Sequence, residues 1–215
     1  MKMISQLPAI LLILLLSGCE STYYSAMEKL GSHKRDILVD RIEETQEAQQ
    51  DTQQQFKDAL EQYQSVVQFD GGDLQKMYNQ LNSEFEDSES AAEDIKEHID
   101  SVEDVAEDLF EEWETELTLY TSASLRREGQ NKLTATKRQY AQMLKAMRKA
   151  ESSTKPVLDS MRDQVLYLKH SLNAKAIASI QGELASINAD VSRLIADMQT
   201  SIDEANRFIE QIKTQ

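Results

Sequence analysis

The strongest constraint on the fold is a repeat of apolar residues that runs from residue 74 to residue 120. Apolar or small side chains recur there at steps of three and four. This spacing aligns them on one seam of a long helix and turns the seam toward a partner helix. The seam comprises Leu74, Tyr78, Leu81, Phe85, Ser88, Ala92, Ile95, Ile99, Val102, Ala106, Leu109, Trp113, Leu117 and Tyr120. A repeat of this length predicts a helical rod and argues against a sheet.

Three other stretches carry the same rhythm. One runs from residue 177 to residue 212, and another covers residues 125–147 and continues through residues 157–172. The first stretch, residues 27–67, is weaker because the very polar residues 43–55 occupy its middle. Only six Gly and two Pro occur among 215 residues, which also favours long helices. We predict an all-α fold, an elongated antiparallel helical bundle or coiled coil of about four long helices.

Helix-breaking residues fall between these stretches. Residues 70–73, Asp-Gly-Gly-Asp, offer a glycine stop and an aspartate N-cap, and residues 121–124 offer a turn with a serine cap. Residues 153–156 place a cap before Pro156, which predicts that the third helix is interrupted near this proline. Residues 171–173 suit a further turn that is capped by Asn173. Because short turns make neighbouring helices antiparallel, we expect an up-down bundle.

Charge is distributed very unevenly along the chain. Residues 84–116 contain sixteen acids and one lysine, so their net charge equals the −15 of the whole chain. Residues 126–149 contain eight basic residues and one acid. The two segments flank the turn at residues 121–124, so we expect them to face each other in a hairpin. Exposed ion pairs are worth only about 0–1 kcal/mol each, so they choose register more than they stabilise.

The acidic segment has three interpretations. Most of its acids are expected to form a solvated helical face, and a docking surface for a basic envelope protein is the main alternative. Calcium binding is disfavoured because no loop of the EF-hand type is present. The sign of the charge disfavours nucleic acid as a partner.

Catalytic and metal-binding patterns are hard to find. The three histidines, His33, His98 and His170, fall on different predicted helices and lack a paired ligand at helical spacing. The sequence contains no phosphate-binding loop, nucleophile elbow or H-E-x-x-H motif. We therefore expect no enzyme activity, no catalytic residue, no metal site and no cofactor.

The N-terminus has the features of an export signal. Lys2 precedes an apolar run from residue 7 to residue 16, and Leu16-Ser17-Gly18 leads into Cys19, the single cysteine. The apolar run is too short to span a membrane as a helix. The residues before Cys19 resemble the bacterial lipobox, which implies cleavage before Cys19 and a covalent lipid on it. The alternative is an ordinary signal peptide with an incidental cysteine.

These features predict the organisation of the chain. Residues 1–18 form the lipoprotein signal peptide, residues 19–24 the lipidated cysteine and a short tether, and residues 25–215 a single helical coiled-coil domain. Glu20 stands where an aspartate would retain a lipoprotein of this type in the inner membrane. Its presence favours the outer membrane, with the protein facing the periplasm. Several acyl chains hold a protein stably, where one would be reversible.

Two segments are more particular than helix packing requires. One covers residues 23–41, Tyr-Tyr-Ser-Ala-Met-Glu-Lys-Leu-Gly-Ser-His-Lys-Arg-Asp-Ile-Leu-Val-Asp-Arg, and the other covers residues 163–179. With the lipobox, they resemble a family of proteobacterial envelope lipoproteins known only as a domain of unknown function. The resemblance implies a helical envelope protein across the mature chain and carries no catalytic residues.

The first of these segments also suggests a contact near the membrane. Its candidate residues are Tyr23, Tyr24, His33, Lys34 and Arg35, which follow Cys19 closely. Tyrosine suits a membrane interface because its ring is apolar and its tip polar. The simpler interpretation of the basic residues is a helix start with solvated cations.

The expected function is that of a structural or adaptor protein. Such a protein would be held to the membrane by its lipid and would contact an envelope protein through helix surfaces. The alternative is a carrier with a groove between helices for an apolar or glycan ligand. In that case Pro156 and residues 43–55 mark where the groove opens.

Overall fold

The computed structural model describes residues 34–68, 71 and 73–214, and every regular element in these ranges is helical. The elements are α3 (Lys34–Val67), α4 (Leu74–Leu119), α5 (Ala123–Ser152), α6 (Thr154–His170) and α7 (Ala174–Lys213). The predicted all-α bundle is confirmed, and α5 with α6 forms one of its four rods. The predicted signal peptide, tether and start of the first helix lie outside the described residues.

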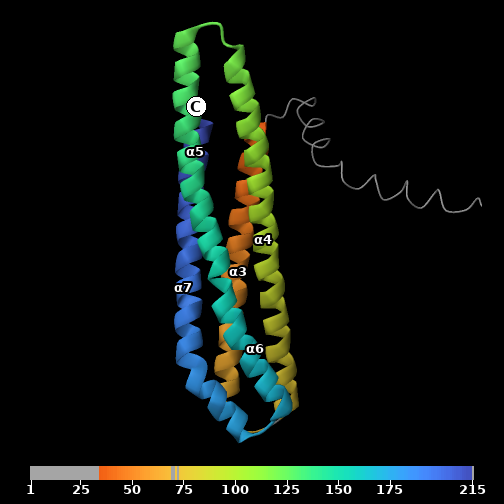
Figure 1. Ribbon diagram of the computed structural model, residues 1–215. Coiled ribbons are helices and arrows are strands. Elements are labelled where there is room, and N and C mark those ends of the chain that lie inside the picture. The colour runs from red at the N-terminus through yellow and green to blue at the C-terminus, as the bar shows by residue number, and fades with distance from the viewer. Residues whose placement is uncertain (1–33, 69–70, 72, 215) are drawn as a thin grey trace, which may run out of the picture.

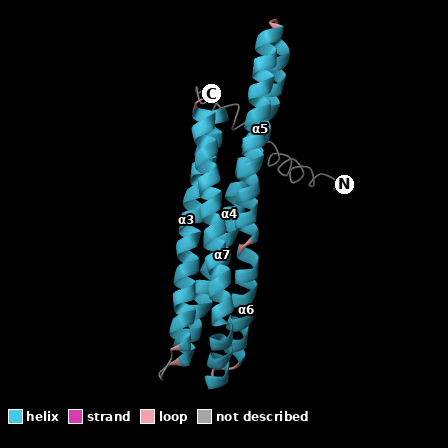
Figure 2. Cartoon of the chain, turned by 90° about the vertical axis from the view of Figure 1, so that its left-hand side faces the viewer, coloured by secondary structure: helices cyan, strands magenta, loops and turns pink. Residues whose placement is uncertain are grey.

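The four rods pack side by side and antiparallel (Figures 1 and 2). Helix α3 packs against α4 and α7, and the rod formed by α5 and α6 packs against the same two helices. The α3 and α5–α6 rods therefore occupy opposite corners of the bundle. Tyr63 reaches across this diagonal, where its hydroxyl donates to the carbonyl of Met161 over 2.7 Å. Burial raises the pKa of the Tyr63 hydroxyl above its usual range.

Polar residues cap three helix starts at the places that the sequence predicts. Asp73 precedes α4 and accepts a hydrogen bond from the Lys76 amide over 3.2 Å. Ser122 caps α5 in the same way, and Asn173 accepts bonds from the first amides of α7. Gly71, at φ 137°, adopts a conformation that favours glycine in the turn before α4. These caps satisfy amides that have no partner inside the helix.

The α5–α6 rod is interrupted at one residue. Helix α5 ends at Ser152 and α6 begins at Thr154, with Ser153 between them at φ −74° and ψ −13°. Pro156 is the third residue of α6. A proline early in a helix removes an amide that would have no intrahelical partner. That Pro156 causes the interruption stays a prediction.

The predicted seams form most of the core, with one correction at the end of α4. Ile95, Ile99 and Val102 are fully buried, as the repeat requires. Further along, Leu109 and Trp113 are only partly buried, and Phe110 occupies the core position instead. The prediction of Trp113 as a core residue is therefore met only in part, since Trp113 packs against the core without being fully buried. Leu109 and Trp113 pack against the edge of the core, and Leu117, the next residue of the seam, is buried again.

The polar residues 43–55, which weaken the apolar repeat of α3, are partly packed inside the bundle. Thr45, Gln46, Gln49 and Thr52 are all buried. The side-chain amide of Gln46 donates to the Ile202 carbonyl over 3.1 Å, and that of Gln49 donates to the Ser201 hydroxyl over 2.9 Å. Buried polar groups are costly unless they are hydrogen-bonded. These bonds let a polar layer cross the apolar core.

The same layer reaches the interruption of the third rod through Asp197 on α7. Asp197 accepts hydrogen bonds of 2.6 Å from the Lys149 ammonium and from the Ser153 hydroxyl. Burial disfavours the Asp197 carboxylate, but these two bonds outweigh burial and lower its pKa below the usual value. Since Asp197 and Ser201 are one turn apart, α7 joins the polar stretch of α3 to Ser153.

Candidate functional site: the groove at the hairpin end

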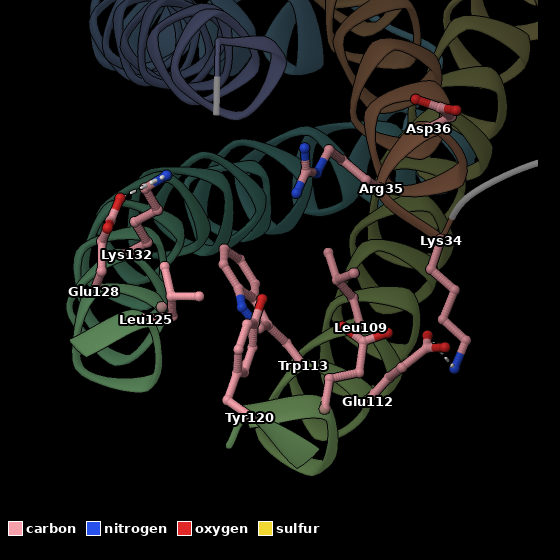
Figure 3. A pocket seen from close by; sticks show the side chains of 12 residues that line it. Lys34, Arg35, Asp36, Leu109, Glu112, Trp113, Tyr120, Leu125, Glu128 and Lys132 are labelled. Carbon is pink, nitrogen blue, oxygen red and sulfur yellow. Dashed lines mark ion pairs between the residues drawn. The ribbon is translucent and has the colours of Figure 1, made fainter. Parts of the chain in front are cut away.

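The hairpin of α4 and α5 rises above the first residue of α3 and the last residue of α7 (Figure 1). At the base of this projection lies an open groove of about 770 Å³. Its lining residues come from α3, α4 and α5 and are Lys34, Arg35, Asp36, Leu109, Glu112, Trp113, Glu116, Tyr120, Leu125, Glu128, Gly129 and Lys132. Figure 3 shows the groove from close by. It lies where α4 and α5 extend past α3 in the described chain.

The groove has an apolar wall. Leu109 and Trp113 come from α4, Tyr120 follows the last residue of α4, and Leu125 faces them from α5 (Figure 3). The guanidinium carbon of Arg35 lies 6.0 Å from the centroid of the Trp113 ring. At this distance a cation is attracted to the face of an aromatic ring. Arg35 therefore covers one side of Trp113 and leaves part of the ring facing the groove.

Charged side chains form the rim. The Lys34 ammonium lies 3.3 Å from the Glu112 carboxylate, and Lys132 lies 3.6 Å from Glu128 (Figure 3). Both pairs are at least partly exposed, so each contributes little to stability. The rim thus combines both charge signs around an apolar wall. Such a mixture suits a peptide or helix better than a small ion.

Gly129 lets the two hairpin helices approach each other beside the groove. A Cβ atom added at Gly129 would lie 2.5 Å from Cδ2 of Leu117. Leu117 is buried against α5 by this close approach. Gly129 falls within the apolar repeat of residues 125–147. A glycine within a helical pattern is a usable signal of close packing.

The predicted charge pairing across the hairpin is present. Lys137 on α5 lies 2.5 Å from Glu114 on α4, and Arg148 pairs with both Asp100 and Glu103. The basic segment therefore faces the acidic one, as the sequence predicts. Lys149 is an exception because its partner is Asp197 on α7.

Other acids of α4 take no part in these pairs. We call Asp87, Asp94, Glu97, Asp104, Asp108 and Glu111 the acidic stripe. Their spacing by three, four or seven residues places them on one side of the helix, opposite the buried Ile95 and Ile99. Within residues 34–68, 71 and 73–214, none of the six forms an ion pair. Like charges at this spacing destabilise a helix slightly, so the stripe does not serve folding.

Two of the predicted site residues are described, and both line the groove. Lys34 and Arg35 contact Glu112 and Trp113 on α4. Cys19, Tyr23, Tyr24 and His33 lie outside the described residues. The structure thus adds α4 and α5 residues that sequence reasoning had assigned to packing or turns. The sequence feature that could have indicated them is the group of apolar residues at one turn, Leu119, Tyr120 and Leu125.

Among the described residues, no three His, Cys, Asp or Glu side chains are placed to hold a metal ion. None of the helices from α3 to α7 has the length and hydropathy needed to cross a membrane.

Comparison with known protein families identifies the family of this chain. The family model described as protein of unknown function (DUF2959) matches residues 23–212. The chain belongs to this family. The DUF2959 match begins eleven residues before the first residue of α3, so the family domain includes part of the segment that precedes the groove. No curated protein matches the sequence.

Proposed function

We propose that this DUF2959 protein is a non-enzymatic lipoprotein of the bacterial outer membrane that faces the periplasm and acts as a structural or adaptor bundle. The observation that carries the adaptor role is the groove, which opens where the α4–α5 hairpin extends past α3. The lipid anchor is supported by the residues that precede Cys19. The groove is lined by Lys34, the first residue of α3, which follows this cysteine by fifteen positions in the sequence.

The partner is a basic protein segment with at least one large apolar side chain. Leu109 and Trp113 offer the apolar contact, and aromatic anchors such as Trp113 supply much of the binding energy at interfaces. The acidic stripe ends at Glu111, next to the groove residue Glu112, so a basic segment in the groove would continue along it. Complementary charge of this type speeds and selects association.

A carrier role is the second candidate. The groove volume falls within the range of small-molecule sites, roughly 300–1,000 Å³. The predicted opening at residues 43–55 and Pro156 is not favoured, because Gln46 and Gln49 are buried and hydrogen-bonded to α7. A carrier would therefore have to use the groove at the hairpin end. Its ion-paired rim favours a protein segment over an apolar ligand.

The adaptor proposal can be tested by photocrosslinking in cells, with a photoreactive residue in place of Glu112. We expect a specific adduct that is lost when the acidic stripe is neutralised by Asp94→Asn, Glu97→Gln, Asp104→Asn and Asp108→Asn. The matched control neutralises four exposed acids of α3 through Asp40→Asn, Glu47→Gln, Asp51→Asn and Glu61→Gln. An adduct that both variants lose equally would contradict the role of the stripe.

The anchor is tested separately. Palmitate labelling should disappear in Cys19→Ser, and density fractionation should recover the wild-type protein with the outer membrane. Labelling that survives the substitution would contradict the lipoprotein assignment, and recovery with the inner membrane would contradict the sorting inferred from Glu20.

A further inference from the structure

The tip of the α4–α5 hairpin exposes large apolar side chains. Leu119 is 74% exposed, Leu125 53% and Tyr120 43%. Single exposed apolar residues are common on protein surfaces. These three, however, lie within seven residues of one another, around one turn. Among the described residues, the other exposed large apolar side chains are Leu166 in α6 and Leu172 in the turn after it. Leu166 is about 60 Å from Leu125 at 1.5 Å per residue.

The chemistry of the tip differs from that of the rest of α4. From Leu117 to Arg127 the sequence contains no acid, although the preceding thirty residues are strongly acidic. Arg126 donates a 2.5 Å hydrogen bond to the Tyr120 carbonyl and so closes the turn, and Arg127 beside it is exposed. Leucine, tyrosine and arginine together suit a lipid interface. Apolar bodies enter the acyl boundary there, while polar tips and cations remain at the headgroups.

The position of the tip matches the end at which the chain would be anchored. Lys34 begins α3 opposite Glu112, and α4 continues for seven more residues to Leu119, or about 10 Å. The tip is therefore the part of the described chain that projects farthest at this end (Figures 1 and 2). Cys19 precedes Lys34 by fifteen residues, which span at most about 50 Å.

We propose that the tip formed by Leu119, Tyr120, Leu125 and Arg127 rests in the headgroup region of the bilayer that anchors the chain. This inference depends on the proposed lipid on Cys19. With the lipid and the tip both in contact, the bundle stands upright on the membrane. The groove then opens beside the bilayer, because Tyr120 and Leu125 belong to both the tip and the groove lining, and Trp113 lies about 9 Å from Leu119 along α4.

The test uses the full lipidated chain, reconstituted in vesicles of phosphatidylethanolamine and phosphatidylglycerol that contain a nitroxide-labelled lipid. Leu119→Cys carries a fluorescent label, and because the Cys19 sulfur is occupied by lipid, this is the only free thiol. Leu166→Cys is the matched control, an exposed leucine at the far end of the bundle. We expect the label at position 119 to lose fluorescence to the nitroxide lipid and the label at position 166 to keep it.

A second variant tests whether the apolar side chains of the tip hold it at the membrane, or whether the tip is only close to the membrane. A label at Thr121→Cys should be quenched in the wild-type tip and should escape quenching when Leu119→Ser and Leu125→Ser are added. Floated vesicles without quenching at position 119 would overturn the tip contact and leave the adaptor proposal standing. Equal quenching at positions 119 and 166 would show that the bundle lies flat, which also overturns it. Failure of the protein to float would overturn the anchor and the tip contact together.

Discussion

The body of the bundle and its hairpin end are built from the same kind of helix but bury very different surfaces. In the body, four rods enclose Phe56, Ile95 and Met161 without exposure to solvent. At the hairpin end, α4 and α5 extend beyond the first residue of α3, and Trp113 faces a groove. The helices continue through both regions, so helix formation does not separate them. Their difference is the number of described neighbours available to cover each apolar face.

The comparison assigns different roles to similar residues. An aromatic side chain in the body stabilises the fold because it removes a large area from water. Trp113 has the same seam spacing, yet it is only partly buried and lines a groove. The body therefore holds the shape, and the hairpin end offers contact surface. Measurements of the free energy of unfolding test this division.

The largest effect is expected for Phe56→Ala in the body, which should lower the free energy of unfolding by about 3–5 kcal/mol because it leaves a cavity. Trp113→Ala in the groove should cost only about 1–2 kcal/mol, since part of the ring is already in contact with water. Urea unfolding followed by circular dichroism measures both. Equal losses would mean that the groove is as tightly packed as the body.

The polar layer of the body should behave as a matched pair. Gln49→Leu alone should cost about 1–3 kcal/mol, because it leaves the buried Ser201 hydroxyl without the amide that now donates to it. Adding Ser201→Ala should restore most of that loss, since an apolar pair of similar shape needs no hydrogen bond. A double-mutant cycle on unfolding free energies gives the coupling. Additive losses would show that the two side chains do not act together.

The charge pairs across the hairpin should contribute less. Arg148→Glu removes the contacts with Asp100, Glu103 and Glu151 and should cost about 1 kcal/mol at low salt, because the pairs are partly exposed. The loss should shrink in high salt, which screens the new repulsion. The control is Arg193→Glu, whose contact is with the neighbouring Asp190 of the same helix. A loss that is independent of salt would point to packing instead of charge.

The smallest effect concerns pH. Because the pKa of Asp197 is lower in the folded protein than its usual value, its bonds to Lys149 and Ser153 stabilise the fold when the carboxylate is ionised. This contribution is present above the unfolded pKa of about 4 and is lost as pH falls through the folded pKa. Asp197→Asn should therefore lower the melting temperature at pH 7 and have less effect as pH falls below 4. Glu116→Gln, an exposed change at the hairpin end, should show no such trend.

Much of the fold is readable from the sequence because helix punctuation and seam spacing are local properties. The caps at Asp73, Ser122 and Asn173 stand where the sequence places them, and so do the buried seams of α4 and α7. The hairpin charge pairing follows as well, since adjacent antiparallel helices need only a turn and opposite signs. The packed role of Gln46 and Gln49 could not be read, because their partners are about 150 residues away on α7.

The sequence by itself determined the helical class, the turns, the antiparallel order and the candidate anchor at Cys19. These depend on periodicity, on single capping residues and on a short motif. Only the tertiary structure decided that Trp113 lines a groove and that Leu119 and Leu125 are exposed at a projecting tip. It also decided that Asp197 connects α7 to the interruption at Ser153. The physical reason is that burial depends on which helix lies alongside. Where one helix extends past its neighbour, apolar residues of the kind that are buried elsewhere along the helix become exposed.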